Sequence, residues 1–172
     1  MRRKAIEELY RWKASADRKP LIVQGARQVG KTWLMKEFAK EAYKKCAYVN
    51  FEDNDMLRQL FEHDFDIQRI INSIQWTTGV TIDTDTLIVL DEIQEAPRGI
   101  TALKYFQEKA PEYHVMAAGS LLGIAMHHND SFPVGKVDFI YLYPLSFFEF
   151  LEAVGEKRMV DLLMSKDWQT IT

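Results

Sequence analysis

Two glycines and a Lys-Thr pair separate an apolar run from a helical pattern in the segment GARQVGKT, residues 25–32. The run before it, Leu21–Gln24, is short and apolar, like a strand that is buried on both faces. After the glycine segment, Leu34, Phe38 and Ala42 recur at helical spacing, which predicts a helix to about residue 43. A strand, a glycine loop and a helix in this order form the first part of a βαβ unit, which requires a parallel sheet.

The same alternation continues along the chain. Further strands are predicted at 46–51, 86–90, 113–118 and 137–142, and further helices at 2–17, 54–75, 97–110 and 144–154. Two of these helices are expected to begin at Pro97 and Pro144, because proline suits a first helical turn. The prediction is an α/β fold, a three-layer sandwich in which five parallel strands carry helices on both faces.

Composition limits the remaining possibilities. The chain has 172 residues, and 22 basic against 25 acidic side chains give a net charge of −3, which suits one domain and disfavours a nucleic-acid coat protein. Cys46 is the only cysteine, so a disulfide or a Cys-rich zinc site cannot form within the chain. No apolar run approaches the roughly 18 residues of a membrane helix. We therefore expect a soluble, cytoplasmic protein with no membrane contact.

The glycine loop matches the phosphate-binding pattern G-x-x-x-x-G-K-[ST] at every fixed position. Its backbone N–H groups can surround a phosphate, and the following helix adds its positive end. Lys31 can reach the β- and γ-phosphates, and the Thr32 hydroxyl can bind Mg²⁺. The expected nucleotide-binding residues are Gly25, Ala26, Arg27, Gln28, Val29, Gly30, Lys31 and Thr32.

The apolar strand at 86–90 is followed by two carboxylates, Asp91 and Glu92. Ligands of open parallel sheets bind at the carboxyl ends of the strands. There Asp91 is expected to hold Mg²⁺ through water, while Glu92, on the other side of the strand, orients or deprotonates an attacking water. A solvated strand end is the alternative for the pair taken alone. A hydrolytic base favours hydrolysis over transfer to a metabolite, so a small-molecule kinase is the weaker interpretation.

Two more residues follow or precede predicted strands. Ser120 would face the γ-phosphate if the strand at 113–118 lies between the loop strand and the acidic strand, and it can also cap the segment 121–126. Lys136 could present a cation to a phosphate, although a surface lysine is the simpler interpretation. The histidines show no metal-binding spacing, and all four are interpreted as surface residues: His63, His114, His127 and His128.

Taken together, these motifs resemble the prokaryotic AAA-like ATPases. The resemblance rests on GARQVGKT (25–32), LIVLDEIQEAP (87–97), AAGSLLG (117–123) and PVGKVDFIYLYPLSFFEF (133–150). It implies an ASCE-type P-loop sheet with strand order 5-1-4-3-2. It also implies that Gly25, Gly30, Lys31 and Thr32 bind nucleotide, that Asp91 and Glu92 serve magnesium and water, and that Ser120 senses the γ-phosphate.

The chain departs from the family pattern at two points. The family usually carries arginine where this chain has Lys136, and arginine is the better phosphate ligand because its guanidinium is a planar fork. Family members also generally continue into a longer C-terminal half that includes a nuclease-like domain. We therefore divide the chain into an ATPase domain, 1–150, and a helical extension, 151–172, as in an isolated ATPase module or a shortened paralogue.

The resulting hypothesis is a Mg²⁺-dependent ATPase domain that switches an attached domain or a partner, which could be a second copy. The alternative is a nucleotide-gated interaction module with little catalysis of its own, completed by a cation from another molecule. ATP is favoured over GTP because the chain has no Asn-Lys-x-Asp segment. Nothing in the sequence supports binding to nucleic acid.

Overall fold

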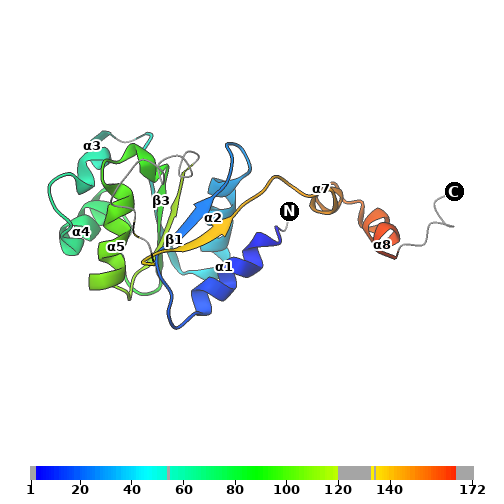
Figure 1. The fold of residues 1–172 in the computed structure, drawn as a ribbon, viewed down its shortest axis with the longest axis horizontal. Coiled ribbons are helices and arrows are strands. Elements are labelled where there is room, and N and C mark those ends of the chain that lie inside the picture. The colour runs from blue at the N-terminus through cyan, green and yellow to red at the C-terminus, as the bar shows by residue number, and fades with distance from the viewer. Residues whose placement is uncertain (1–2, 54, 120–132, 134, 166–172) are drawn as a thin grey trace.

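The computed structural model describes residues 3–53, 55–119, 133 and 135–165 (Figure 1). Its strands are β1 (Leu21–Gln24), β2 (Lys45–Asn50), β3 (Thr86–Asp91), β4 (His114–Ala118) and β5 (Asp138–Tyr141). Its α-helices are α1 (Ala5–Ala14), α2 (Lys31–Ala42), α3 (Asp55–Arg58), α4 (Ile67–Thr78), α5 (Gly99–Lys109), α7 (Phe147–Ala153) and α8 (Lys157–Ser165). Short 3₁₀ helices occupy Gln59–Phe61 and Ile93–Glu95. None of the described helices is long and apolar enough to cross a membrane.

The five strands form one parallel sheet in the order β2-β3-β4-β1-β5. Counted from the other edge, this is the predicted order 5-1-4-3-2, so the predicted α/β fold is confirmed. Strand β4 lies between the strand of the glycine loop, β1, and the acidic strand, β3. The condition set for Ser120 is therefore met, although Ser120 itself lies outside the described residues.

Successive residues of the central strands point to opposite faces and fill two separate cores. On one face, Ile88 and Leu90 of β3 pack with apolar residues of α4 and α5. On the other face, Leu87 and Val89 pack with residues of α1 and α2. The helices accordingly cover both faces of the sheet (Figure 1), while α7 and α8 lie beyond the end of β5, away from it. Burial on both faces explains why the strands are apolar without alternation.

Two predicted helix starts are wrong. Helix α5 begins at Gly99 rather than Pro97, because Pro97 lies in the turn that follows the 3₁₀ helix. Helix α7 begins after Ser146 rather than at Pro144. There the Ser146 hydroxyl accepts from the backbone N–H of Glu149, and the Glu149 carboxylate accepts from the backbone N–H of Ser146. This capping box satisfies two otherwise unpaired donors, and it determines the start of the helix.

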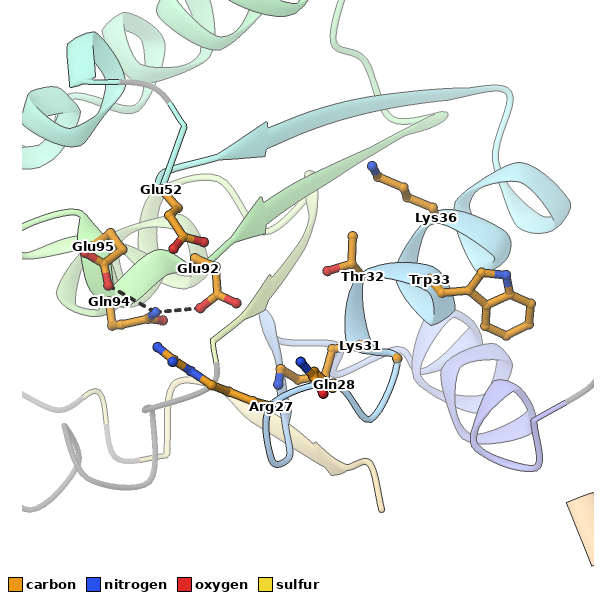
Figure 2. Close-up of a pocket in the computed structure, with 11 residues that line it drawn as sticks. Arg27, Gln28, Lys31, Thr32, Trp33, Lys36, Glu52, Glu92, Gln94 and Glu95 are labelled. Carbon is orange, nitrogen blue, oxygen red and sulfur yellow. Dashed lines mark hydrogen bonds between the residues drawn. The ribbon is translucent and has the colours of Figure 1, made fainter. Parts of the chain in front are cut away.

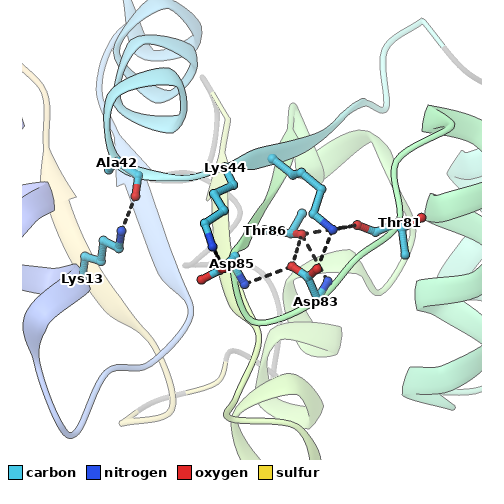
Figure 3. A network of polar contacts seen from close by, with 8 residues as sticks. Lys13, Ala42, Lys44, Thr81, Asp83, Asp85 and Thr86 are labelled. Atoms are coloured by element: carbon cyan, nitrogen blue, oxygen red, sulfur yellow. Dashed lines mark hydrogen bonds and ion pairs between the residues drawn. The ribbon is translucent and has the colours of Figure 1, made fainter.

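The N-terminal edge of the sheet carries a network of polar contacts (Figure 3). Lys44 Nζ lies 2.6 Å from Asp85 Oδ2, and Lys45 Nζ lies 2.5 Å from Asp83 Oδ2. Asp83 also accepts from the Thr86 hydroxyl at 2.9 Å. These partners hold the turn before β3 against β2, but pairs this exposed contribute little stability each.

His114 is not the surface residue that the sequence suggested. It begins β4, is half-buried, and its Nδ1 lies 2.6 Å from the hydroxyl of Tyr43. Burial lowers the pKa of His114 to about 4, and the nearby positive charges of Arg18 and Lys13 act in the same direction. Its imidazole is therefore neutral in the folded chain at neutral pH.

This neutral imidazole predicts a pH-dependent stability. Between the ordinary pKa of 6.5 and the folded value of about 4, the unfolded chain binds more protons at His114 than the folded chain does. The stability that His114 contributes is therefore lost as the pH falls through this window. We expect the free energy of unfolding, measured with urea at pH 7 and pH 5, to fall less in His114→Asn than in the natural sequence. Screening at the half-buried site keeps the difference on the order of 1 kcal/mol.

His63 is exposed and provides the matched control. The His63→Asn variant should keep the pH dependence of the natural sequence. Equal pH dependence in all three proteins would contradict the assignment of a neutral, half-buried imidazole to His114.

Candidate functional site

The glycine loop joins β1 to α2 at the C-terminal edge of the sheet, and both of its glycines are required by geometry. A Cβ on Gly25 would lie 2.3 Å from the carbonyl oxygen of Leu142, at the end of β5, so no larger residue fits. Gly30, which precedes α2, has a φ of 92°, in the left-handed region that favours glycine. Helix α2 starts directly after Gly30, and the first N–H groups of a helix have no partner within the helix.

Lys31 ties the loop together from inside. Lys31 is the first residue of α2 and is only 6% exposed. The ammonium donates to the carbonyl oxygens of Gly25 and Ala26, both at 2.8 Å. Burial lowers the pKa of Lys31, and the negative charges of Glu92 and Asp91 oppose this shift. A cation held by neutral carbonyls at a helix N-terminus is well suited to binding an anion.

Asp91, the last residue of β3, is a carboxylate that is only 2% exposed and has three donors. Its Oδ2 accepts from the hydroxyl of Thr32 at 2.7 Å and from that of Tyr48 at 2.9 Å. Its Oδ1 accepts from the backbone N–H of Glu92 at 3.1 Å. The structure thus brings together Thr32 and Asp91, the two residues that the sequence analysis expects to hold Mg²⁺. A hydroxyl beside a carboxylate is the hard-oxygen donor set that Mg²⁺ prefers.

Glu92 follows the end of β3 in a left-handed turn, with a φ of 50°. This conformation is uncommon outside glycine, and such backbone strain clusters at functional sites. The carboxylate Oε2 accepts from the amide nitrogen of Gln94 at 2.6 Å. The amide thereby restricts the position of a carboxylate at the edge of the cavity.

A cavity of about 630 Å³ connects these groups, and its size is typical of small-molecule sites. Figure 2 shows Lys31 and Thr32 on the α2 side of it and Glu92 and Gln94 on the other, with Arg27 extending from the loop toward Gln94. The lining residues are Arg27, Gln28, Gly30, Lys31, Thr32, Trp33, Lys36, Glu52, Glu92, Gln94 and Glu95.

Two predicted residues lie outside the loop and the acidic pair. Ser120 lies outside the described residues. Lys136 precedes β5, whose Asp138 is in register with Leu21 at the start of β1, whereas the glycine loop follows the end of β1. Lys136 therefore lies at the N-terminal ends of the strands, whereas the glycine loop lies at their C-terminal ends. There its Nζ lies 3.0 Å from Glu108 Oε1. This arrangement favours the surface interpretation of Lys136.

Tyr48 was missed by the sequence reasoning, although it holds Asp91. It lies on β2, which pairs with β3 in the register Tyr48↔Val89 and Asn50↔Asp91. Burial raises the pKa of the Tyr48 phenol, and the hydrogen bond to Asp91 raises it further, so the hydroxyl stays a donor. The ammonium of Lys36 lies 3.8 Å from the centre of the Tyr48 ring. A pairing register between distant strands leaves no local signal in the sequence.

The family is shown by a direct match. A family model described as an AAA domain matches residues 17–151. The chain belongs to the AAA domain family. This agrees with the resemblance carried by the sequence motifs, and the fold and the loop together make the chain an AAA-type P-loop ATPase domain. None of the curated proteins matches the chain.

Three solved structures are similar in fold. The Walker-type ATPase PABY2304 of Pyrococcus abyssi has a TM-score of 0.56 at 16% identity, covering 87% of this chain and 57% of that one. The Aeropyrum pernix ORC1 protein, solved in complex with DNA, has a TM-score of 0.54 at 14% identity, covering 92% and 48%. PCH-2 of C. elegans has a TM-score of 0.51 at 14% identity, covering 94% and 46%. The chain thus spans about half the length of these structures.

The Tyr48 hydroxyl provides the first test of this site. In Tyr48→Phe the buried Asp91 loses one of three donors, so the free energy of unfolding without nucleotide should fall by about 1–2 kcal/mol. Urea denaturation measures this difference.

Tyr10→Phe is the matched control. The Tyr10 hydroxyl donates to Glu41 at 3.2 Å on the exposed surface, and its loss should change stability by no more than about 0.5 kcal/mol. If both variants lose the same stability, Tyr48 is not a specific support of Asp91.

Proposed function

We propose that this AAA domain binds ATP together with Mg²⁺, hydrolyses it slowly, and uses the bound nucleotide to switch an attached domain or a partner. The observation that carries the proposal is the hydrogen bond of 2.7 Å between Thr32 and Asp91, beside the buried Lys31 ammonium. The sequence keeps a hydroxyl, a carboxylate and a cation together at the end of a phosphate-binding loop, and simple folding does not require that combination.

The donor set fits both groups. Thr32 and Asp91 would hold Mg²⁺, directly or through water, and the N–H groups of the loop and α2 would bind the phosphates with Lys31. When bound, the metal would neutralise phosphate charge and hold the phosphate oxygens in place. The cavity has room for a nucleotide, since it measures about 630 Å³.

The chain's own side chains suggest how hydrolysis proceeds. Lys31 would give up its two loop carbonyls in exchange for phosphate oxygens. Glu92, held by Gln94 at 2.6 Å, would accept a hydrogen bond from a water at the edge of the cavity and orient it toward the phosphate. A positioned carboxylate of this kind typically contributes 10²–10⁴-fold to a rate.

Lys31→Ala tests the nucleotide site. Loss of the buried cation should abolish measurable binding of a fluorescent ATP analogue in titrations that saturate the natural sequence. Circular dichroism should show an intact fold. Binding of undiminished tightness in the folded variant would contradict the assignment of the loop.

Glu92→Gln separates binding from hydrolysis. The amide still accepts and donates hydrogen bonds but is a poor base, so ATP binding should persist while turnover falls by about 10²-fold or more. Glu112→Gln is the control, because Glu112 is an exposed glutamate that does not line the cavity; it should retain turnover. Unchanged turnover in Glu92→Gln would remove the proposed role of Glu92.

A second candidate is a nucleotide-gated interaction module whose site is completed by a cation from another molecule. The position of Lys136 favours it, since this lysine is paired with Glu108 at the far edge of the sheet from the glycine loop. A cation supplied in trans can raise turnover by 10³–10⁵-fold. Turnover per molecule should then rise with protein concentration. A constant value across a wide concentration range would contradict this second candidate.

A further inference from the structure

Arg3 is a buried arginine that links the glycine loop to α7. The residue is only 4% exposed. Its Nη1 donates to the carbonyl oxygen of Val29 in the loop at 3.2 Å, and its Nη2 donates to that of Tyr143, between β5 and α7, at 2.6 Å. Its Nε lies 3.4 Å from Oε1 of Glu149, in α7. One guanidinium therefore joins the N-terminal segment to the glycine loop and to the stretch 143–149, both far from it in the sequence.

Glu149 is fixed from two further directions. Its Oε2 accepts from the backbone N–H of Ser146 in the capping box of α7, and its Oε1 accepts from the backbone N–H of Lys4 at 3.1 Å. Burial alone raises the pKa of Glu149, but these backbone hydrogen bonds and the charge of Arg3 outweigh burial and lower it. The carboxylate is therefore ionised at neutral pH and forms a buried ion pair with the Arg3 guanidinium.

The contact with Val29 controls a second group in the loop. A peptide unit is planar and trans, so the carbonyl of Val29 and the N–H of Gly30 point in opposite directions. Fixing the carbonyl on Arg3 therefore fixes the direction of the Gly30 N–H, and Gly30 lines the cavity. Arg3 thus acts on the ligand side of the loop without lining the cavity.

We propose that Arg3 is a positioning residue for the phosphate loop. We also propose that, through Glu149, it couples nucleotide binding to the packing of α7 against the N-terminal segment. This inference rests on the proposed function, because it requires that a nucleotide binds the loop. A bound phosphate favours one orientation of the Val29–Gly30 peptide. The Arg3 and Glu149 contacts transmit that preference to the first turn of α7. Because removing one partner of a buried ion pair is costly, the two ends stay joined.

Thermodynamic linkage makes the coupling testable from either end. If bound nucleotide shifts the equilibrium of α7 toward its packed position by some factor, then nucleotide affinity must be lower by that factor when α7 is not packed. A residue that merely supported the fold would change stability and leave nucleotide affinity unaltered. The affinity of variants in α7, which lies outside the described cavity, is therefore the decisive quantity.

The experiment compares the 172-residue chain with Glu149→Gln and Glu152→Gln. Glu152 lies on the same helix and is exposed, so it is the matched control. Two quantities are measured, the affinity for MgATP by calorimetry and the hydrogen exchange of the α7 backbone with and without saturating MgATP. In the natural sequence, MgATP should slow exchange in α7.

Glu149→Gln should weaken MgATP binding about tenfold, as expected when the buried Arg3 guanidinium loses its charged partner. It should also abolish the effect of MgATP on exchange in α7, while Glu152→Gln behaves like the natural sequence. Arg3→Lys keeps the charge but not the fork geometry, and it should weaken binding to a similar extent.

The possible failures are distinguishable. If the natural sequence does not bind MgATP, the proposed function falls, and the coupling falls with it. If it binds but exchange in α7 is unchanged, only the coupling is overturned, and this result needs no variant. If Glu149→Gln and Arg3→Lys lose stability but keep full affinity, Arg3 is a structural support and the proposal is wrong.

Discussion

The buried carboxylate of Asp91 requires hydrogen-bond donors from several elements of the fold, and this requirement constrains where those elements lie. A charge that is only 2% exposed is costly unless hydrogen bonds replace its water. Its three donors come from α2, from β2 and from the residue that follows β3. Meeting that requirement fixes β2 beside β3 in one register, and it fixes the start of α2 above the carboxyl end of β3. The pairing of β2 with β3 and the position of α2 therefore both serve to stabilise one buried charge.

Local signals made the centre of the site predictable. The glycine loop and the Asp91–Glu92 pair each combine a short motif with a strand beside it, and strand order follows once the family is recognised. Tyr48 and Arg3 lacked such a signal, because each meets its partner across a separation that only the folded chain closes. His114 was misjudged for the same reason: its burial depends on Tyr43, at the end of a different element. Sequence alone thus predicted the residues that we propose to carry the chemistry and missed those that hold them.

The two edges of the sheet solve different problems. At the N-terminal edge, exposed ion pairs such as that of Lys45 with Asp83 fasten turns, with little energetic consequence for each. At the C-terminal ends of the strands, Gln28 and Glu92 adopt positive φ, and the charged residues Lys31 and Asp91 are buried. Strain and buried charge both reduce stability, and in proteins they gather at functional sites.

Two cations hold the glycine loop, from opposite ends and with different consequences. Lys31 binds the carbonyls of Gly25 and Ala26, which are neutral partners that an incoming phosphate can replace. Arg3 binds the carbonyl of Val29 and is paired with the ionised Glu149, so a phosphate has no comparable means of displacing it. The first half of the loop can then respond to the ligand while the second half stays anchored to α7. On the proposed coupling, a phosphate that favours one orientation of the Val29–Gly30 peptide acts on α7 through this anchored half of the loop, and a nucleotide switch requires such a connection.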